Sequence, residues 1–280
     1  MIRILCCFKT VPDPDRFSEA DWASGAASGN FDFGWIQRIL DPSSEIALEL
    51  ALRARDSSKG SKVLEAGGSE TSSPEPEIRL TAAALEGETA DRELRALAAL
   101  GFEETWRIEL PDSYEPDAET TAAAIADFCR KTGPYDLIVT GSVSADGENR
   151  KIPFLLAESL GIPCLNQVLS FQAISENRIT AEYATESGRI RESAALPLVL
   201  ACGDSPGVLL RIPTLMQRRA SSGHEIRVFS VNGEPAGAPR VVLEGLEQPD
   251  AGRSAERIGG SSAEEQAENL FVFLQERGLV

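Results

Sequence analysis

The stretch YDLIVTGSVSADGENRKIPFLLAESLGIP, residues 135–163, decides the fold that the sequence predicts. Residues 137–139 form a short apolar run with β-branched members that ends near Gly141, which is typical of a buried parallel strand. Residues 142–150 then predict a loop. Apolar residues at helical spacing over 153–160 predict a helix, which the following glycine and proline end.

A loop that joins the carboxyl end of a strand to a helix often binds phosphate in α/β proteins. Free backbone N–H groups and the helix dipole both point at the ligand there. An ordinary connection without a ligand has the same pattern. The stretch alone therefore leaves both interpretations open.

Composition excludes several classes of protein. The chain has 280 residues, 42% of them hydrophobic, which is enough for one large core or two modest ones. No apolar run approaches the ~18 residues of a membrane span, and the N-terminus lacks the pattern of a secretory signal, so we expect a cytoplasmic protein. The formal net charge of -17 argues against nucleic acid or an anionic membrane surface as a partner.

The cysteines and the histidine give little support for a metal site, a disulfide or hydrolytic chemistry. The five cysteines are odd in number, scattered and without C-x-x-C spacing. Four of them lie in apolar runs or predicted helices, where we expect core residues. The single histidine, His224, follows a Ser-Ser-Gly stretch, and no triad or Cys-His pair is evident around it.

Predicted strands and helices alternate through the first two-thirds of the chain, which indicates an α/β fold with a mostly parallel sheet and helices on both faces. Closely spaced strands over 165–202 predict an antiparallel meander added to this sheet. A strand at 225–231, a long Pro- and Gly-rich excursion and an amphipathic helix at 261–277 follow. We therefore assign residues 1–230 to the core and 231–280 to a C-terminal arm and helix.

Four segments carry local predictions of their own. Residues 18–30 are small and polar, which predicts a loop, and residues 31–40 predict a short hairpin. Asp41 begins a helix, because it can cap the N-terminus and is followed by proline and by an acidic residue in the first turn. Residues 56–77 are rich in Ser, Gly, Glu and Pro, so we expect a flexible insertion.

Motifs in a consistent order resemble the β subunit of electron transfer flavoproteins over most of the chain. The N-terminal CCFKTVPD is similar to that family's C-V-K-x-V-P-D strand, and DPSSEIALE at 41–49 to its N-P-x-D/E-E-x-A-x-E-E helix start. LAALG at 97–101 resembles A-L-A-M-G. The stretch at 135–163 resembles D-L-I-x-x-G…D-G-D-T-x-Q-V-G-P…A-E-x-L-G-I-P. LP at 196–197 with RIPTLM at 211–216 resembles L-P-A-V-V…S-L-P-x-I-M.

The resemblance implies a Rossmann-like subunit of the adenine nucleotide alpha hydrolase-like type, which pairs with an FAD-containing α subunit. Residues 231–280 resemble the arm and C-terminal helix by which the family's β subunit reaches its partner subunit. The pair would carry electrons from a flavin-dependent dehydrogenase to a downstream acceptor, and this subunit would bind AMP or FAD. The positions that would bind the nucleotide lie at strand ends or at a helix start, where doubly wound sheets bind ligands. Matched residue by residue, the nucleotide-binding positions are Cys7, Lys9, Asp41, Leu85, Glu86, Gly87, Gly141, Asp146, Gly147, Glu148, Asn149, Arg150 and Lys151.

Some residues in and around the predicted nucleotide site depart from the family pattern. Ser142 and Val143 stand where the family has a Lys or Arg and a Gln, and Pro153 replaces a glycine and so removes a backbone donor. Asp41 replaces an asparagine and places an anion where it could repel phosphate. Arg150 and Lys151 could compensate by pairing with phosphate, or they could be only the solvated start of the helix. Either the nucleotide site is functional, or it has decayed within a preserved fold.

The resemblance also places a partner-recognition loop at residues 203–211, where Leu209 and Leu210 are the candidates for docking a dehydrogenase. This stretch is shorter than the family's loop and lacks its N-E-P-R-Y. An adjacent apolar pair also fits a buried core, and we favour that interpretation.

The sequence is therefore compatible with functions from different classes. One is an electron-transfer subunit that does no bond chemistry itself, because the redox chemistry belongs to flavin. Another is a binding module that senses or holds an adenine nucleotide, or acts as a structural partner. A stand-alone ATP-using enzyme is disfavoured, since the sequence has no G-x-x-x-x-G-K-[ST] loop and no clear catalytic base.

Overall fold

The structure, a computed structural model, describes residues 1–28, 34–60, 76–111, 117–232 and 256–280. The chain divides into two compact units. The larger comprises Met1–Ser18 and Asp32–Glu244, and the smaller comprises Glu19–Phe31 and Gly245–Val280. Helix α1 (Glu19–Ser28) and helix α7 (Ala263–Glu276) belong to the smaller unit.

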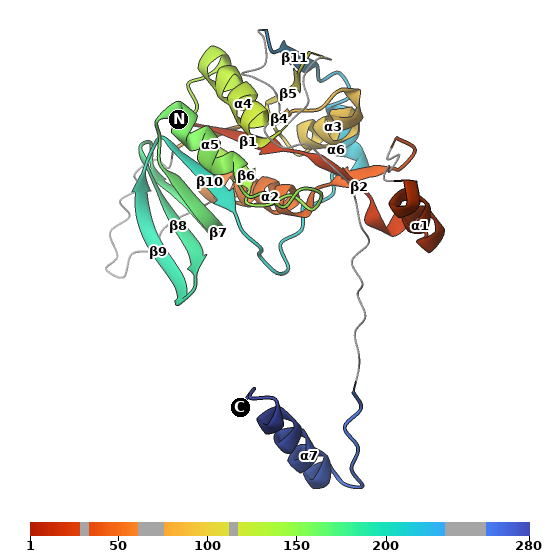
Figure 1. Cartoon of the computed structure of the whole chain (residues 1–280). Coiled ribbons are helices and arrows are strands. Elements are labelled where there is room, and N and C mark those ends of the chain that lie inside the picture. The colour runs from red at the N-terminus through yellow and green to blue at the C-terminus, as the bar shows by residue number, and fades with distance from the viewer. Residues whose placement is uncertain (29–33, 61–75, 112–116, 233–255) are drawn as a thin grey trace, which may run out of the picture. The chain divides into compact units, whose positions relative to one another are not determined.

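Within the described residues, the larger unit is built on a nine-stranded sheet in the order β11-β5-β4-β1-β6-β10-β7-β8-β9 (Figure 1). All neighbours from β11 to β7 are parallel, whereas β7, β8 and β9 are antiparallel to one another. The predicted α/β fold with a mostly parallel sheet is therefore confirmed. The strands are β1 Ile2–Phe8, β4 Ile78–Ala84, β5 Glu104–Glu109, β6 Leu137–Gly141, β7 Cys164–Ser175, β8 Arg178–Thr185, β9 Gly188–Ala195, β10 Leu198–Cys202 and β11 Ile226–Ser230.

Helices cover both faces of this sheet, which explains why its central strands are almost wholly apolar. Side chains of α2 and α3 share one buried cluster with one face of β1, and side chains of α4 and α5 share a second cluster with the other. Phe102 and Phe128 are among the largest side chains that are fully buried. The helices of the larger unit are α2 Pro42–Gly60, α3 Asp91–Ala99, α4 Ala118–Thr132, α5 Ile152–Leu160 and α6 Leu215–Ala220, with 3-10 turns at Pro14–Arg16 and Glu88–Ala90.

The order of the strands reverses at β1. From β1 the chain passes through α2 to β4 and through α3 to β5, and α4 then returns it to β6 on the other side of β1. The carboxyl ends of β1, β4 and β6 therefore meet at a topological switch point. In open α/β sheets this is where ligands bind.

The predicted meander is correct for three of its four strands. The fourth, β10, lies between β6 and β7 and is parallel to both. All five of its residues are buried, whereas β9 is almost entirely exposed. A short run that is apolar throughout belongs in the centre of a sheet, so it returns there rather than extending the edge.

Three local predictions differ from the structure. Residues 18–30 were expected to form a loop, but α1 occupies most of them, with Glu19 and Asp21 in its first turn. In the described part of the predicted hairpin, residues 34–40, the strand β3 (Arg38–Leu40) pairs with the distant β2 (Thr10–Pro12) and not with a neighbouring strand of the same hairpin.

The first residues of the expected flexible insertion, 56–60, instead form the end of α2. The rest of that segment, residues 61–75, and most of the C-terminal excursion, residues 233–255, lie outside the described residues. Among the helices that the structure describes, none is long and apolar enough to cross a membrane.

Candidate functional site

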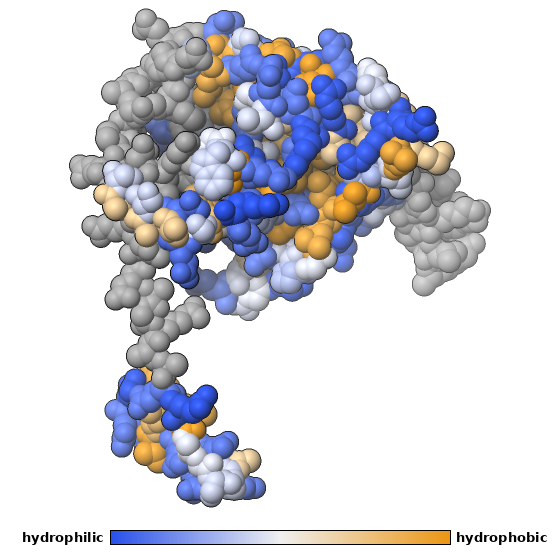
Figure 2. Space-filling model, turned by 90° about the vertical axis from the view of Figure 1, so that its right-hand side faces the viewer, coloured by the Kyte–Doolittle hydropathy of each residue, from blue (hydrophilic) through white to orange (hydrophobic). Residues whose placement is uncertain are grey.

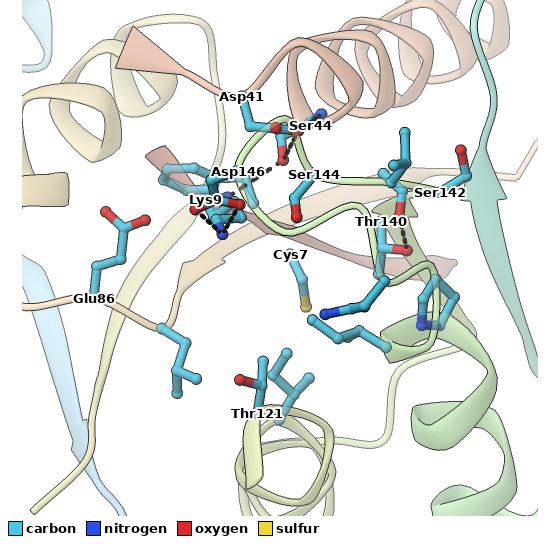
Figure 3. Close-up of a pocket in the computed structure, with 18 of the residues that line it drawn as sticks. Cys7, Lys9, Asp41, Ser44, Glu86, Thr121, Thr140, Ser142, Ser144 and Asp146 are labelled. Atoms are coloured by element: carbon cyan, nitrogen blue, oxygen red, sulfur yellow. Dashed lines mark hydrogen bonds and ion pairs between the residues drawn. The ribbon is translucent and has the colours of Figure 1, made fainter. Parts of the chain in front are cut away.

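A cavity of about 330 Å³ lies at the carboxyl ends of β1, β4 and β6, at the switch point (Figure 3). Its wall combines the loop after β6, the start of α2 and the first turns of α4 and α5. Nine of the thirteen predicted nucleotide-binding residues line it: Cys7, Lys9, Asp41, Leu85, Glu86, Gly141, Asp146, Asn149 and Arg150. The other four, Gly87, Gly147, Glu148 and Lys151, are not among its lining residues.

Gly141 lets the end of β6 pass directly against the first turn of α2. A Cβ atom at this position would lie 2.7 Å from the Cβ of Ser43 and 3.1 Å from the backbone nitrogen of Ser44. Such contacts are too short for any side chain, and backbone atoms cannot give way cheaply. The absence of a side chain therefore keeps the loop after β6 and the start of α2 together on one wall of the cavity.

Asp41 joins these two segments through its carboxylate. Oδ1 accepts the backbone N–H of Ala145 at 2.8 Å, and Oδ2 accepts the backbone N–H of Ser44 at 3.1 Å. The residue is 1% exposed. A carboxylate whose lone pairs are used by N–H donors at a helix start is stabilised there. The sequence-based expectation treated Asp41 as a free anion facing phosphate, whereas its charge is already compensated by these donors.

Lys9 and Asp146 form an ion pair inside the cavity. The ammonium nitrogen lies 2.7 Å from each carboxylate oxygen of Asp146, and the two side chains point toward one another in Figure 3. Burial opposes the ionisation of Asp146, but the hydrogen bonds and charge of Lys9 outweigh it and hold the pKa of this carboxyl below its usual range. The pair links the end of β1 to the loop after β6.

Glu86, another charged residue of the cavity lining, is held by Thr10 and Arg38. Its Oε1 accepts the Thr10 N–H at 2.5 Å, its Oε2 accepts the Thr10 hydroxyl at 2.6 Å, and Arg38 lies 3.7 Å away. Burial raises the pKa of Glu86, and the contacts with Thr10 and Arg38 offset only part of this effect. Arg38 also donates to the hydroxyl and carbonyl oxygens of Thr10, so the ribbon of β2 and β3 is fixed to the cavity rim.

The loop after β6 contains two strained residues. Glu148 and Arg150 have positive φ angles of 44° and 56° although neither is glycine. Residues other than glycine adopt this conformation at a cost of about 1–2 kcal/mol each. Asn149, between them, accepts the Lys151 N–H through Oδ1 at 3.1 Å. Strain of this kind, held in place by neighbouring contacts, is common at ligand sites.

The start of α5 is a poor phosphate cradle. Pro153 has no N–H, and the N–H of Phe154 donates to the carbonyl of Lys151 at 3.1 Å. The Lys151 side chain turns toward Glu119, 3.9 Å away. Arg150 is different: within the described part of the chain, its guanidinium has no ion pair or hydrogen-bond partner, and it lines the cavity.

Sequence reasoning missed several residues that line the cavity. Thr121 and Ile125 come from one face of α4, and their i, i+4 spacing on a helix after a strand was a usable signal. The place of Arg38 on the cavity lining could not be predicted from local patterns, because its partners are distant in the sequence. The remaining lining residues are Phe8, Ser44, Ala83, Ile108, Thr140, Ser142, Val143, Ser144, Ile152 and Pro153. Apolar and hydroxyl-bearing walls together suit a flat heterocycle attached to a sugar.

The cysteines do not add chemistry to this wall. Cys7 lines the cavity, and burial raises the pKa of its thiol, so it stays protonated and weakly reactive. The five cysteines are free thiols. His224 contacts the hydroxyl of Thr105 through Nε2 at 3.1 Å, away from the cavity. No group of three or more His, Cys, Asp or Glu residues that could hold a metal ion occurs among the described residues.

The two leucines of the expected recognition loop have different surroundings. Leu210 packs against the core, as we favoured, and its N–H donates to Glu45 at 3.0 Å. Leu209, in contrast, is 71% exposed. Ile212, Leu215 and Met216 are also largely exposed, so with Leu209 they form an apolar surface, which we call the loop patch.

Arg211 fixes the loop patch to α2. Its Nε and Nη2 donate to Glu49 at 3.0 and 2.9 Å, and its Nη1 donates to Asp56. Glu49 also accepts the Arg211 backbone N–H at 3.2 Å and Nε of Arg53 at 3.0 Å. Burial alone would raise the pKa of Glu49, but these hydrogen bonds hold it below its usual range.

Comparison with known proteins agrees with this architecture. The electron transfer flavoprotein domain matches residues 36–207. The chain is 32% identical to "Putative electron transfer flavoprotein subunit YgcR" of Escherichia coli (strain K12), over 99% of both chains. It is 23% identical to the electron transfer flavoprotein subunit beta of Bacillus subtilis (strain 168), over 86% of this chain and 88% of the relative. It is 24% identical to the caffeyl-CoA reductase-Etf complex subunit CarD of Acetobacterium woodii, over 100% of both. The chain therefore belongs to the electron transfer flavoprotein family, as a protein similar to its beta subunits.

Proposed function

We propose that this chain is the β-type subunit of an electron transfer flavoprotein and holds an adenine nucleotide in the cavity at the switch point. The observation that carries the proposal is the cavity itself, where the loop after β6, the start of α2 and the end of β1 converge. Gly141 provides close backbone approach, and Arg150 provides a cation without an internal partner among the described residues. These features suit a phosphate-bearing ligand.

AMP fits the cavity better than FAD does. A volume of about 330 Å³ is at the lower end of the ~300–1,000 Å³ typical of small-molecule sites. A site of this size favours a mononucleotide over a dinucleotide. We therefore propose AMP as the ligand, with a structural role.

The proposed partner is a second subunit that contains FAD. The flavin supplies the redox chemistry, while the residues of this chain bind, orient and dock. The subunit would accept electrons from a flavin-dependent dehydrogenase as half of a heterodimer. It would be an electron carrier rather than a catalyst on its own.

Helix α7 has the properties of a docking element. Leu270, Phe271 and Val272 are about half exposed, and none of its residues is buried. Figure 2 shows an apolar stripe on this helix beside strongly hydrophilic residues. A helix with such a stripe gains stability when another protein surface covers it. The stripe therefore supports pairing with a partner subunit.

The first experiment is to denature the purified protein and identify any released small molecule by mass spectrometry and absorbance. Released AMP supports the proposal. Released FAD would replace AMP as the ligand. If nothing is released and added AMP does not raise the melting temperature, the nucleotide part of the proposal is wrong.

Arg150 and Lys151 provide a matched pair of variants for the same site. Arg150→Ala should weaken AMP binding by about fivefold or more in isothermal titration calorimetry, since it removes a charge-assisted contact. Lys151→Ala should leave the affinity within about twofold, because Lys151 faces Glu119 and is not part of the lining. Equal effects of the two changes would contradict the placement of the phosphate at Arg150.

A second candidate function is a binding module whose nucleotide site has decayed. The engaged ammonium of Lys9 and the missing N–H of Pro153 are the observations that favour it. A protein that neither contains nor binds AMP or FAD, but still co-purifies with an electron transfer flavoprotein α subunit, would support this alternative.

A further inference from the structure

Asp146 pairs with Lys9, one of the cations that line the cavity. Its carboxylate oxygens are both 2.7 Å from the ammonium nitrogen of Lys9, and both side chains line the cavity. The two side chains are 37% and 38% exposed, so the pair is in contact with the solvent-filled space of the cavity. A ligand that enters therefore meets Lys9 with its charge already paired.

The other charged groups of the cavity cannot exchange partners as readily. The Asp41 carboxylate is buried and held by two backbone N–H groups, and Glu86 is held by Thr10. Arg38 is held by Thr10 through two of its nitrogens. The Lys9 and Asp146 side chains are both partly exposed, so the Lys9 ammonium can leave the carboxylate while Asp146 keeps its hydrogen bonds with Ser144 and its own backbone.

We propose that Asp146 is a specificity-determining residue that competes with the ligand's phosphate for Lys9. A phosphate group that carries two negative charges competes with the carboxylate for Lys9 more strongly than a phosphate group that carries one. A terminal phosphomonoester carries ≈ −1.5 to −2 charges at pH 7, as estimated for phosphorylated side chains, whereas each phosphate of a pyrophosphate diester carries about one. The pair therefore weakens the binding of a singly charged phosphate more than that of a doubly charged one, which favours a nucleoside monophosphate over a dinucleotide. This inference rests on the proposed nucleotide site.

The loop geometry supports this role. Asp146 lies on the same loop as Arg150, whose strained backbone places it on the cavity lining. When Lys9 is released from Asp146, a phosphate between Lys9 and Arg150 would have a cation on each side. Asp41 holds this loop through the N–H of Ala145, one residue before Asp146, so the loop stays in place while the ion pair opens.

The inference makes a prediction of unusual sign: removing a lining residue improves binding. Asp146→Asn should raise the affinity for AMP by about three- to tenfold, since it frees Lys9 and removes a like charge near the phosphate. The affinity for adenosine, which has no phosphate, should stay within about twofold. Isothermal titration calorimetry with AMP and with adenosine measures both on the full-length protein.

Two further variants separate competition from loop opening. The Lys9→Met variant should bind AMP more weakly than wild type. When Asp146→Asn is added to Lys9→Met, the AMP affinity should rise by less than it does in the wild-type background, because only the removal of the like charge then contributes. Asp127→Asn is the matched control, because Asp127 and Lys131 form an ion pair of 2.7 Å on α4 outside the cavity. It should leave AMP affinity unchanged.

The outcomes distinguish this inference from the proposed function. If neither wild type nor Asp146→Asn binds AMP or adenosine, the proposed nucleotide site fails. If wild type binds AMP but Asp146→Asn binds it equally or more weakly, the site stands and the competition is refuted. A parallel gain for adenosine would also refute it, because it would show that the change merely opens the loop.

Discussion

Replacing Arg211 by methionine should loosen the loop patch from α2 and destabilise the larger unit. The change removes two hydrogen bonds to the Glu49 carboxylate, at 3.0 and 2.9 Å, and the contact with Asp56. The Glu49 side chain is 5% exposed, so water cannot replace those donors. Methionine keeps much of the apolar stem of arginine, so the loss reports mainly on the charged contacts.

The magnitude follows from what Glu49 retains. Truncating one partner of a buried ion pair costs about 3–5 kcal/mol when the other charge is left alone. Here Glu49 keeps Nε of Arg53 at 3.0 Å and the backbone N–H of residue 211 at 3.2 Å. We therefore expect a loss of about 1.5–3 kcal/mol in the free energy of unfolding. For a unit of this size that corresponds to a fall of roughly 3–10 °C in melting temperature.

The pH dependence provides a second test. Hydrogen bonds lower the pKa of Glu49 in the folded protein, so its contribution to stability is present above the unfolded pKa and is lost as the pH falls through the folded pKa. The difference between wild type and Arg211→Met should therefore be largest near pH 7. It should shrink below pH ~4.5, the region in which an unfolded glutamate titrates.

Urea unfolding followed by circular dichroism at several pH values measures this difference. Arg189→Met is the matched control, since Arg189 is 70% exposed and reaches Glu182 at 3.4 Å; it should change the free energy of unfolding by no more than about 0.5 kcal/mol. A loss below 0.5 kcal/mol for Arg211→Met, or a loss that does not change with pH, would refute the anchoring role of the pair.

Three other predictions concern the cavity and the loop patch. Gly141→Ala should destabilise the protein by about 1–3 kcal/mol in thermal unfolding, because the new Cβ would lie 2.7 Å from Ser43; an unchanged melting temperature would contradict that packing. Burial raises the pKa of Glu86, so the free energy of unfolding should fall as the pH rises through this raised pKa. The Glu86→Gln variant should show a smaller fall in the free energy of unfolding, and the same pH profile in both proteins would contradict this reasoning. Ile212→Ser with Met216→Ser should leave the melting temperature within about 2 °C, since both side chains are more than 80% exposed, yet should weaken binding to a partner flavoprotein subunit or dehydrogenase in pull-down assays; unchanged capture of both partners would exclude the loop patch as a docking surface.

The sequence was sufficient for most of the fold because its local signals agree with one another. The strand of residues 2–8 and the helix that Asp41 begins have strong apolar or capping signals, and both are present. Helix α1 was missed because its serine, glycine and aspartate residues suggested a loop, although four of its ten residues are alanine, the residue with the highest helix propensity. The position of β10 between β6 and β7 was missed for a different reason: strand order depends on long-range pairing, which local periodicity does not encode.

The candidate site was predictable as a location but not as a set of charges. Motif spacing brought nine of thirteen positions to one cavity. Sequence alone assigned Asp41 a repulsive role, because it shows charges without their partners. In the folded protein the Asp41 carboxylate accepts hydrogen bonds from backbone N–H groups, and the Asp146 carboxylate accepts one from Lys9.

What a cavity of mixed charge can bind therefore depends on which charges are already paired and how strongly. Two carboxylates of this cavity, Asp41 and Glu86, are fixed by backbone or short hydrogen bonds and act as structure. Asp146 is held by partly exposed Lys9 and by hydrogen bonds within its own loop, from the Ser144 side chain and its own backbone. A ligand can change only the contact between Asp146 and Lys9 at low cost. The selectivity of the cavity should accordingly reside in Asp146, and the rigidity of its walls in Asp41 and Glu86.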